Sequence, residues 1–263
     1  MPGTLVCFHA HPDDEAIMTG GTIARASEAG HRVVVVFATR GELGEILDGV
    51  SRTTDELGEH RTGEAERAAL ALGAQRVAFL GFHDSGMAGD PSNDVEGAFW
   101  STDREAAAAR LANLLRDEHA EVLTTYDERG GYEHPDHIKV HEVGLRAAEL
   151  AGTPRVYCAT VSREHFEAVT AKYLDAPDAP DAPDTGDAPL GVEEARITTV
   201  VDVSGQLERK RAAMAAHASQ IPDSSVFLSL PDDAFADVFG REWFIRVGAD
   251  PPATDADRDD WLF

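Results

Sequence analysis

The sequence predicts an α/β fold: a doubly wound, mostly parallel sheet with helices on both faces. Short apolar, β-branched runs alternate with helical patterns along most of the chain, which is typical of repeated strand–helix–strand units. Residues 33–36 are four consecutive valines, as in a strand that is buried on both faces. In such sheets, ligands bind at the carboxyl ends of the strands, so a site is expected there.

Each expected element rests on its own hydrophobic pattern and its own end signals. The predicted strands are residues 5–8, 32–38, 76–80, 121–126, 155–161, 196–203 and 243–247. The predicted helices are residues 16–29, 53–72, 103–119, 138–151 and 206–219. Three of these helices are followed by a glycine, which is a common helix stop: Gly30, Gly73 and Gly152. Together the elements indicate a Rossmann-like arrangement.

Length and composition favour one large domain over residues 1–263. The chain has 263 residues, of which 43% are hydrophobic, enough for a sizeable core. One stretch stands apart: residues 175–189 repeat Asp-Ala-Pro and contain few apolar side chains, so we expect a disordered, acidic insertion. From residue 250 the chain is a polar tail whose apolar end, 261–263, can dock back onto the domain.

Charge argues against several classes of partner. The formal net charge is −25 and no basic patch is visible, so neither nucleic acid nor an anionic membrane surface is an expected partner. No signal peptide or membrane-spanning run is apparent. Cys7 and Cys158 lie in apolar, strand-like stretches and are expected to be buried thiols. These features predict a cytoplasmic protein and leave oligomerisation possible.

Two related motifs follow predicted strands. The first is His11-Pro12-Asp13-Asp14-Glu15, after strand 5–8; the second is His134-Pro135-Asp136-His137, after strand 121–126. Together they supply two or three imidazoles and at least two carboxylates, which is the ligand set of a catalytic zinc site with a carboxylate to spare as a base. The loops at 39–51 and 81–102 begin at the same expected edge of the sheet.

The spacing of the motifs leaves the individual roles open. Neighbouring side chains do not easily bind the same ion, so Asp13 and Asp14 are expected to divide into one ligand and one base. His134 and His137 are either both ligands, or one ligand and one substrate contact. The alternative is that the aspartates are helix caps and the histidines lie on the surface. We favour the functional interpretation, because the alternative requires both motifs to be inert although they share one edge of the sheet.

Several segments resemble a known enzyme family. Phe8-His-Ala-His-Pro-Asp-Asp-Glu15 and Gly131-Tyr-Glu-His-Pro-Asp-His137 are similar to motifs of the LmbE-like, PIG-L-type zinc-dependent de-N-acetylases. Residues 39–45, 61–64, 84–89, 124–127 and 216–220 resemble the mycothiol branch of that family. That branch contains a deacetylase of mycothiol biosynthesis and the mycothiol S-conjugate amidase.

The resemblance implies a role for each motif residue. It implies a zinc ion, with iron(II) possible in the same site, bound by His11, Asp14 and His137. Asp13 would be the general base and then the acid that protonates the leaving amine. The resemblance further implies that His134, oriented by Asp136, helps to stabilise the tetrahedral oxyanion, and that Tyr132 is a mobile oxyanion or substrate contact.

The family also implies a substrate class. Three charged residues match positions that contact sugar and inositol hydroxyls in similar enzymes: Glu45, Arg61 and Asp84. The expected partner is a small-molecule amide or glycoconjugate, and the expected activity is removal of the acetyl group from an N-acetylglucosaminyl conjugate, of the glucosaminyl-inositol type.

Three alternative functions remain open from the sequence. The protein could be a mycothiol S-conjugate amidase, a deacetylase of another N-acetylated sugar, or a sugar-binding module without catalytic activity. The amidase usually has a lysine shortly after the first motif, and residues 16–20 contain none. Residues 201–204 and 259–263 nevertheless resemble the amidase subgroup. The intact histidines and aspartates of both motifs argue against a module without activity.

Overall fold

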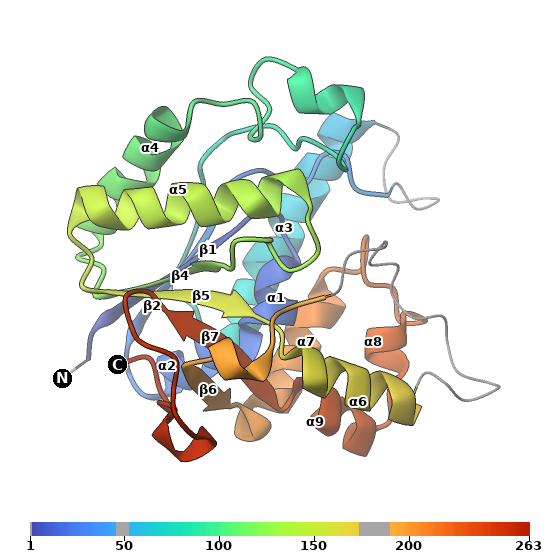
Figure 1. The fold of residues 1–263 in the computed structure, drawn as a ribbon. Coiled ribbons are helices and arrows are strands. Elements are labelled where there is room, and N and C mark those ends of the chain that lie inside the picture. The colour runs from blue at the N-terminus through green and yellow to red at the C-terminus, as the bar shows by residue number, and fades with distance from the viewer. Residues whose placement is uncertain (1, 46–52, 174–189) are drawn as a thin grey trace.

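A computed structural model describes residues 2–45, 53–173 and 190–263, and in these ranges a seven-stranded sheet runs through the molecule (Figure 1). Its order is β3-β2-β1-β4-β5-β7-β6. The strands are β1 (Thr4–His9), β2 (Arg32–Phe37), β3 (Arg76–Phe79), β4 (Val122–Tyr126), β5 (Arg155–Thr160), β6 (Thr199–Asp202) and β7 (Arg241–Arg246). β1 to β5 are parallel, which confirms the predicted α/β fold. The predicted acidic insertion lies outside the described residues.

Helices cover both faces of the sheet. They are α1 (Asp14–Met18), α2 (Gly20–Glu28), α3 (Thr54–Leu72), α4 (Arg104–Asp117), α5 (Pro135–Ala151), α6 (Arg163–Tyr173), α7 (Leu207–Ala216), α8 (Val226–Ser229) and α9 (Asp232–Phe239). α4 and α5 pack together above the sheet in Figure 1, and α2 and α7 pack together below it. α3 contacts both α2 and α7.

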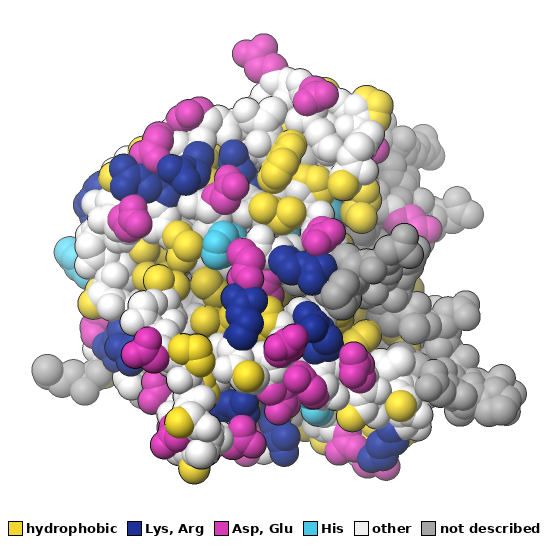
Figure 2. Space-filling model, in the orientation of Figure 1, with side chains coloured by type: hydrophobic (Ala, Val, Ile, Leu, Met, Phe, Trp, Pro, Cys, Tyr) yellow, Lys and Arg dark blue, Asp and Glu magenta, His cyan; other side chains and the backbone are white. Residues whose placement is uncertain are grey.

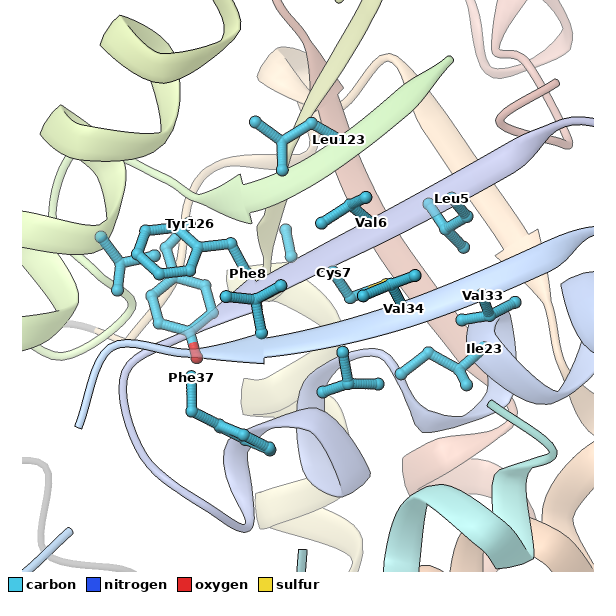
Figure 3. Close-up of a cluster of buried hydrophobic side chains, with 14 of the residues drawn as sticks. Leu5, Val6, Cys7, Phe8, Ile23, Val33, Val34, Phe37, Leu123 and Tyr126 are labelled. Atoms are coloured by element: carbon cyan, nitrogen blue, oxygen red, sulfur yellow. The ribbon is translucent and has the colours of Figure 1, made fainter. Parts of the chain in front are cut away.

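The core is centred on β1 and β2. Side chains 5–8 and 33–36 are fully buried, as a parallel sheet covered on both faces requires. Figure 3 shows Leu5, Val6 and Phe8 of β1 beside Val33 and Val34 of β2. Pairing of Leu5 with Val33 sets the register between these two strands.

The order of the strands creates a crevice beside β1. From β1 the chain adds β2 and β3 on one side, and later β4 and β5 on the other. Connections therefore leave the carboxyl ends of β1 and β4 in opposite directions, and such a switch point, called the crevice below, is where open α/β sheets bind ligands. The first histidine motif follows β1 and the second follows β4, so the fold places both at the crevice.

The predicted helix 16–29 is wrong in one respect, because it is two helices. The break lies at Thr19, whose backbone φ is −133°. Its buried hydroxyl contacts Nε2 of His9 at 3.0 Å. The new helix is capped from far along the chain: the carboxylate of Glu242 accepts the N–H groups of Gly21 and Thr22, both at 2.8 Å. Because Glu242 lies 220 residues beyond Thr22, the sequence around the break carries no sign of this cap.

The C-terminal third differs most from expectation. β7 lies between β5 and β6 and is antiparallel to both. Helices α6, α8 and α9 were not predicted. α7 ends at Ala216, three residues before the predicted end, because the backbone turns at His217 (φ −90°, ψ 45°). The apolar end of the tail does dock: Leu262 is buried, and the Phe263 ring stacks on His31 at 3.6 Å.

The described surface is mixed in charge on the face in Figure 2, where Lys and Arg side chains lie among Asp and Glu. None of the helices that the structure describes is long and apolar enough to cross a membrane. Both cysteines are buried and free, as predicted.

Candidate active site

The two motifs meet at the crevice, where Asp14 lies between two histidines. Its Oδ1 is 3.4 Å from Nε2 of His137, and its Oδ2 is 3.7 Å from Nδ1 of His11. Oδ2 also accepts the backbone N–H of His11 at 2.9 Å. Burial alone would raise the pKa of Asp14, but His137 and His11 outweigh it and lower the pKa to about 2. Asp14 is therefore an ionised carboxylate at neutral pH.

The ring of His137 presents Nε2 to Asp14. Nδ1 of His137 is 3.1 Å from the carbonyl oxygen of Gly130, so this nitrogen carries the proton that it donates. Burial lowers the pKa of His137. Nε2 lies 3.4 Å from Oδ1 of Asp14, and an imidazole nitrogen whose ring is fixed through its other nitrogen, next to a carboxylate oxygen, is a usual arrangement for metal ligands.

The other edge of the His11 ring faces acidic groups. Nε2 of His11 is 3.2 Å from Oδ2 of Asp136 and 3.6 Å from Oδ1 of Asp84. Although burial opposes it, Asp84 and Asp136 raise the pKa of His11 well above its ordinary value. A carboxylate that accepts the outer N–H of a histidine fixes the ring and leaves its inner nitrogen as a ligand, the usual arrangement around protein-bound metals.

His134 is a hydrogen-bond donor by the same reasoning. Its Nδ1 accepts the backbone N–H of Asp136 at 3.1 Å, so the proton of the neutral ring is on Nε2. Burial, and the neighbouring His11 and His137, lower the pKa of His134 to about 3. Asp136 contacts His134 through its backbone, while its carboxylate reaches His11 and the N–H of Ser85.

Asp13 is held in an unusual backbone conformation. Its φ is 112°, in the left-handed region that non-glycine residues rarely adopt. Its Oδ2 is 3.3 Å from Nη2 of Arg61, and 19% of its side chain is exposed. Burial raises the pKa of Asp13 to about 6 against the opposing effect of Arg61, which is suitable for a general base. Of the other non-glycine residues described, only His119 and Glu133 have positive φ, and Glu133 lies in the second motif region.

The three expected substrate residues occupy different positions. Arg61 is buried and bonds Asp13 and the backbone carbonyls of Pro12 and Gly41. Asp84 lies beside His11 and accepts the N–H groups of Leu43 and Gly86. Glu45 is the farthest out: its side chain is exposed at the end of the described loop.

Tyr132 completes one side of the site. Its hydroxyl is 3.4 Å from Nε2 of His137. Burial, with Asp14 and Asp13 nearby, raises the pKa of Tyr132, so the phenol stays protonated and able to donate. It follows Gly130 and Gly131, whose φ values of 61° and 81° allow the sharp turn into the motif.

A buried pair next to Asp13, Glu15 and His217, had no role predicted from the sequence. Nε2 of His217 is 2.6 Å from Oε1 of Glu15, and both side chains are fully buried. The signals were present, because Glu15 closes the first motif and His217 lies in the 216–220 segment. Their contact was hidden by a separation of 202 residues.

The described part of the chain brings a donor set of buried nitrogens and oxygens to this crevice. One group with ligand atoms within 4.8 Å of one another is His11, His134 and His137; a second is His11, Asp84 and Asp136. In addition, Oδ1 of Asp136 is buried without a hydrogen-bond partner. Imidazole and carboxylate donors of this kind suit a divalent transition metal.

Comparisons with known proteins identify relatives of this chain. The profile of the GlcNAc-PI de-N-acetylase family, PIG-L, matches residues 6–148, which include both motifs. A curated relative from Acidothermus cellulolyticus is 39% identical; the alignment covers 99% of this chain and 94% of that protein. It is named 1D-myo-inositol 2-acetamido-2-deoxy-alpha-D-glucopyranoside deacetylase.

Solved structures share the fold at lower identity. N,N'-diacetylchitobiose deacetylase from Pyrococcus horikoshii is 23% identical with a TM-score of 0.64, covering 96% of this chain and 88% of that one. GalB, a 4-carboxy-2-hydroxymuconate hydratase from Pseudomonas putida, is 20% identical with a TM-score of 0.59, covering 97% and 99%. Since one of these is a hydratase, the fold by itself does not fix the reaction. The family match and the curated relative do settle membership: this chain belongs to the PIG-L family of GlcNAc-PI de-N-acetylases.

Proposed function

We propose that this protein hydrolyses the acetamide of an N-acetylglucosaminyl-inositol, releasing acetate and a primary amine. The observation that carries the proposal is the cluster in which Asp14 lies between His11 and His137, with the ring of His134 at 4.8 Å from that of His11. The name of the Acidothermus cellulolyticus relative supports the choice of substrate.

The proposed metal is zinc, held by Nδ1 of His11, a carboxylate oxygen of Asp14 and Nε2 of His137. Iron(II) suits the same donors. When bound, zinc would polarise the amide carbonyl and make the attacking water more acidic. The proton on Nε2 excludes His134 from this ligand set and makes it a donor instead.

The protein groups then handle protons and charge. Asp13, as a carboxylate, accepts a proton from the attacking water and later delivers it to the leaving nitrogen, so that the C–N bond breaks and a neutral amine departs. The second proton of the water leaves with acetic acid, which ionises to acetate in solution. The Nε2–H of His134 donates to the developing oxyanion, and the Tyr132 hydroxyl lies nearby to donate as well. A single oxyanion donor of this type contributes about 3–4 kcal/mol to catalysis.

A substrate panel tests the proposal. We expect faster acetate release from N-acetylglucosaminyl-inositol than from free N-acetylglucosamine, and far faster than from N-acetyl amino acids. The reason is that polar side chains around the crevice lose about 1–3 kcal/mol each when an apolar group leaves them unpaired. Release of acetate and amine is measured with and without added zinc. Preference for an N-acetyl amino acid or for an S-conjugated thiol amide would contradict the assignment.

Glu45→Ala probes the outer part of the substrate. Because the family resemblance places Glu45 among the residues that contact sugar and inositol hydroxyls, we expect its loss to raise KM for the inositol-bearing substrate about tenfold, with little change for the free sugar. Glu66→Ala, at an exposed position on α3, is the matched control and should change neither KM. Equal effects of Glu45→Ala on both substrates would remove this residue from the aglycone site.

Metal removal should separate activity from folding. The ligands lie at the edge of a sheet that has its own buried core, so the metal is proposed to be catalytic, not structural. Chelation should lower turnover to less than about a tenth and leave the far-ultraviolet circular dichroism unchanged, and zinc should restore turnover. Loss of the helical signal on chelation would contradict this.

The buried free thiols of Cys7 and Cys158 support a reducing, cytoplasmic location.

A further inference from the structure

We propose that Glu15, anchored by His217, is a positioning residue that holds the general base Asp13 in its working orientation. The inference rests on the proposed hydrolysis with Asp13 as the base. One carboxylate connects the two ends of the arrangement: Oε2 of Glu15 accepts the backbone N–H of Asp13 at 2.9 Å, and Oε1 lies 2.6 Å from Nε2 of His217.

The backbone of Asp13 needs such a contact. A φ of 112° is sparsely populated by residues with a side chain, and it persists only where the surroundings impose it. The carbonyl of Asp13 accepts the N–H groups of Ala16 and Ile17 in the first turn of α1. Its carboxylate meets Arg61. The remaining group, the N–H, is held by Glu15 alone among the described residues.

The pair is completely buried, with Glu15 and His217 both at 0% exposure. Burial of an ionised carboxylate is unfavourable unless partners replace its hydration, so the imidazole is required once Glu15 is placed beside Asp13. The backbone turn that ends α7 brings His217 to this position.

The loop that carries His217 is itself fixed. Ser219 donates its N–H and its hydroxyl to the buried carboxylate of Glu64 on α3, at 2.8 and 2.6 Å. The support of Asp13 thus comes from residues beyond 148, where the match to the family profile ends. The C-terminal part of the chain would then help to determine turnover, and not stability alone.

The test compares two replacements of Glu15. Glu15→Met removes both acceptor oxygens at similar volume, and we expect kcat to fall at least 30-fold while KM stays within threefold and metal content stays unchanged. Glu15→Gln keeps a side-chain oxygen that accepts the Asp13 N–H. Its NH2 group would then face Nε2 of His217, which can accept this hydrogen bond when the proton of the ring is on Nδ1. This conservative variant should restore kcat to within about fivefold of the original protein.

Three further measurements distinguish positioning from general structure. Glu118→Met removes another buried carboxylate, one that pairs with Arg32 and Arg76 at the amino ends of β2 and β3, far from Asp13, and kcat should stay within threefold. Adding Glu15→Met to Asp13→Asn should lower kcat by less than threefold more, because Glu15 acts through Asp13. A crystal structure of metal-free Glu15→Met should show that Asp13 has left its positive φ.

The outcomes are distinct from those of the proposed function. If the unaltered protein deacetylates the substrate and Glu15→Met retains more than a thirtieth of kcat, the positioning role is wrong while the function stands. Loss of metal in Glu15→Met also overturns it, since Glu15 would then act through the ligands. If Glu15→Met does not fold, His217→Phe carries the same test with the same thresholds. Failure of both variants to fold would show a purely structural pair and reject the proposal.

Discussion

Replacing Asp13 by Asn is expected to lower kcat by about 10²–10⁴-fold, the range for loss of a general base, while the protein keeps its metal. The amide has the shape of the carboxylate but does not accept the proton of the attacking water. Asp13 also lies beside Arg61, outside the contacts that join Asp14 to the histidines. Metal content by emission spectroscopy, and kcat by acetate release, are measured on the same preparation.

Asp14→Asn is the matched variant, one residue away and of the same chemistry. Asp14 touches both His11 and His137, so this change should release the metal, and with it the activity. Added zinc should restore part of the turnover in Asp14→Asn and none in Asp13→Asn. A metal-free Asp13→Asn, or an Asp14→Asn that keeps its full metal content, would show that the two roles are reversed.

The parts of the fold that were predictable depend on local signals. β1 and β2 lie within two residues of expectation at each end, because a continuous apolar run in a buried strand is read directly from the sequence. Helices α3 and α5 end where expected, since Gly73 and Gly152 adopt the left-handed conformation that stops them, with φ of 80° and 73°.

The parts that were missed depend on distant partners. The break between α1 and α2 rests on Glu242, which belongs to the last strand. The antiparallel insertion of β7 rests on pairing between segments whose order in the sheet differs from their order in the chain. A short helix such as α8, four residues long, has too few positions to show periodicity.

The candidate site was likewise predictable only in part. Spacing placed the histidines and aspartates of both motifs at one edge, since residues that follow parallel strands share that edge. It did not distinguish ligand from donor at His134 and His137. That distinction comes from a backbone N–H on Nδ1 of one ring and a carbonyl oxygen on Nδ1 of the other. Such contacts depend on the exact turn of the loop, which composition does not reveal.

Glu242→Leu is expected to lower the free energy of unfolding by about 3–5 kcal/mol, the cost of breaking a buried ion pair from one side. Oε1 of Glu242 is 2.5 Å from Nζ of Lys210, and the two side chains are 2% and 1% exposed. The same carboxylate accepts the first N–H groups of α2. Its loss would therefore leave a buried ammonium group and an uncapped helix at once.

The charge and the cap can be separated by a second change. In the double variant Glu242→Leu with Lys210→Met, no buried charge remains, so part of the lost stability should return although the α2 cap is still missing. Thermal unfolding measures both, and each kcal/mol corresponds to roughly 2–4 °C in Tm for a chain of this size. A Glu242→Leu protein that melts within about 2 °C of the original would show that water reaches Lys210 and that the pair contributes little. If stability recovers in the double variant, the recovered part is the cost of the unpaired, buried ammonium group of Lys210. The part that is not recovered is the contribution of the Glu242 cap at the start of α2.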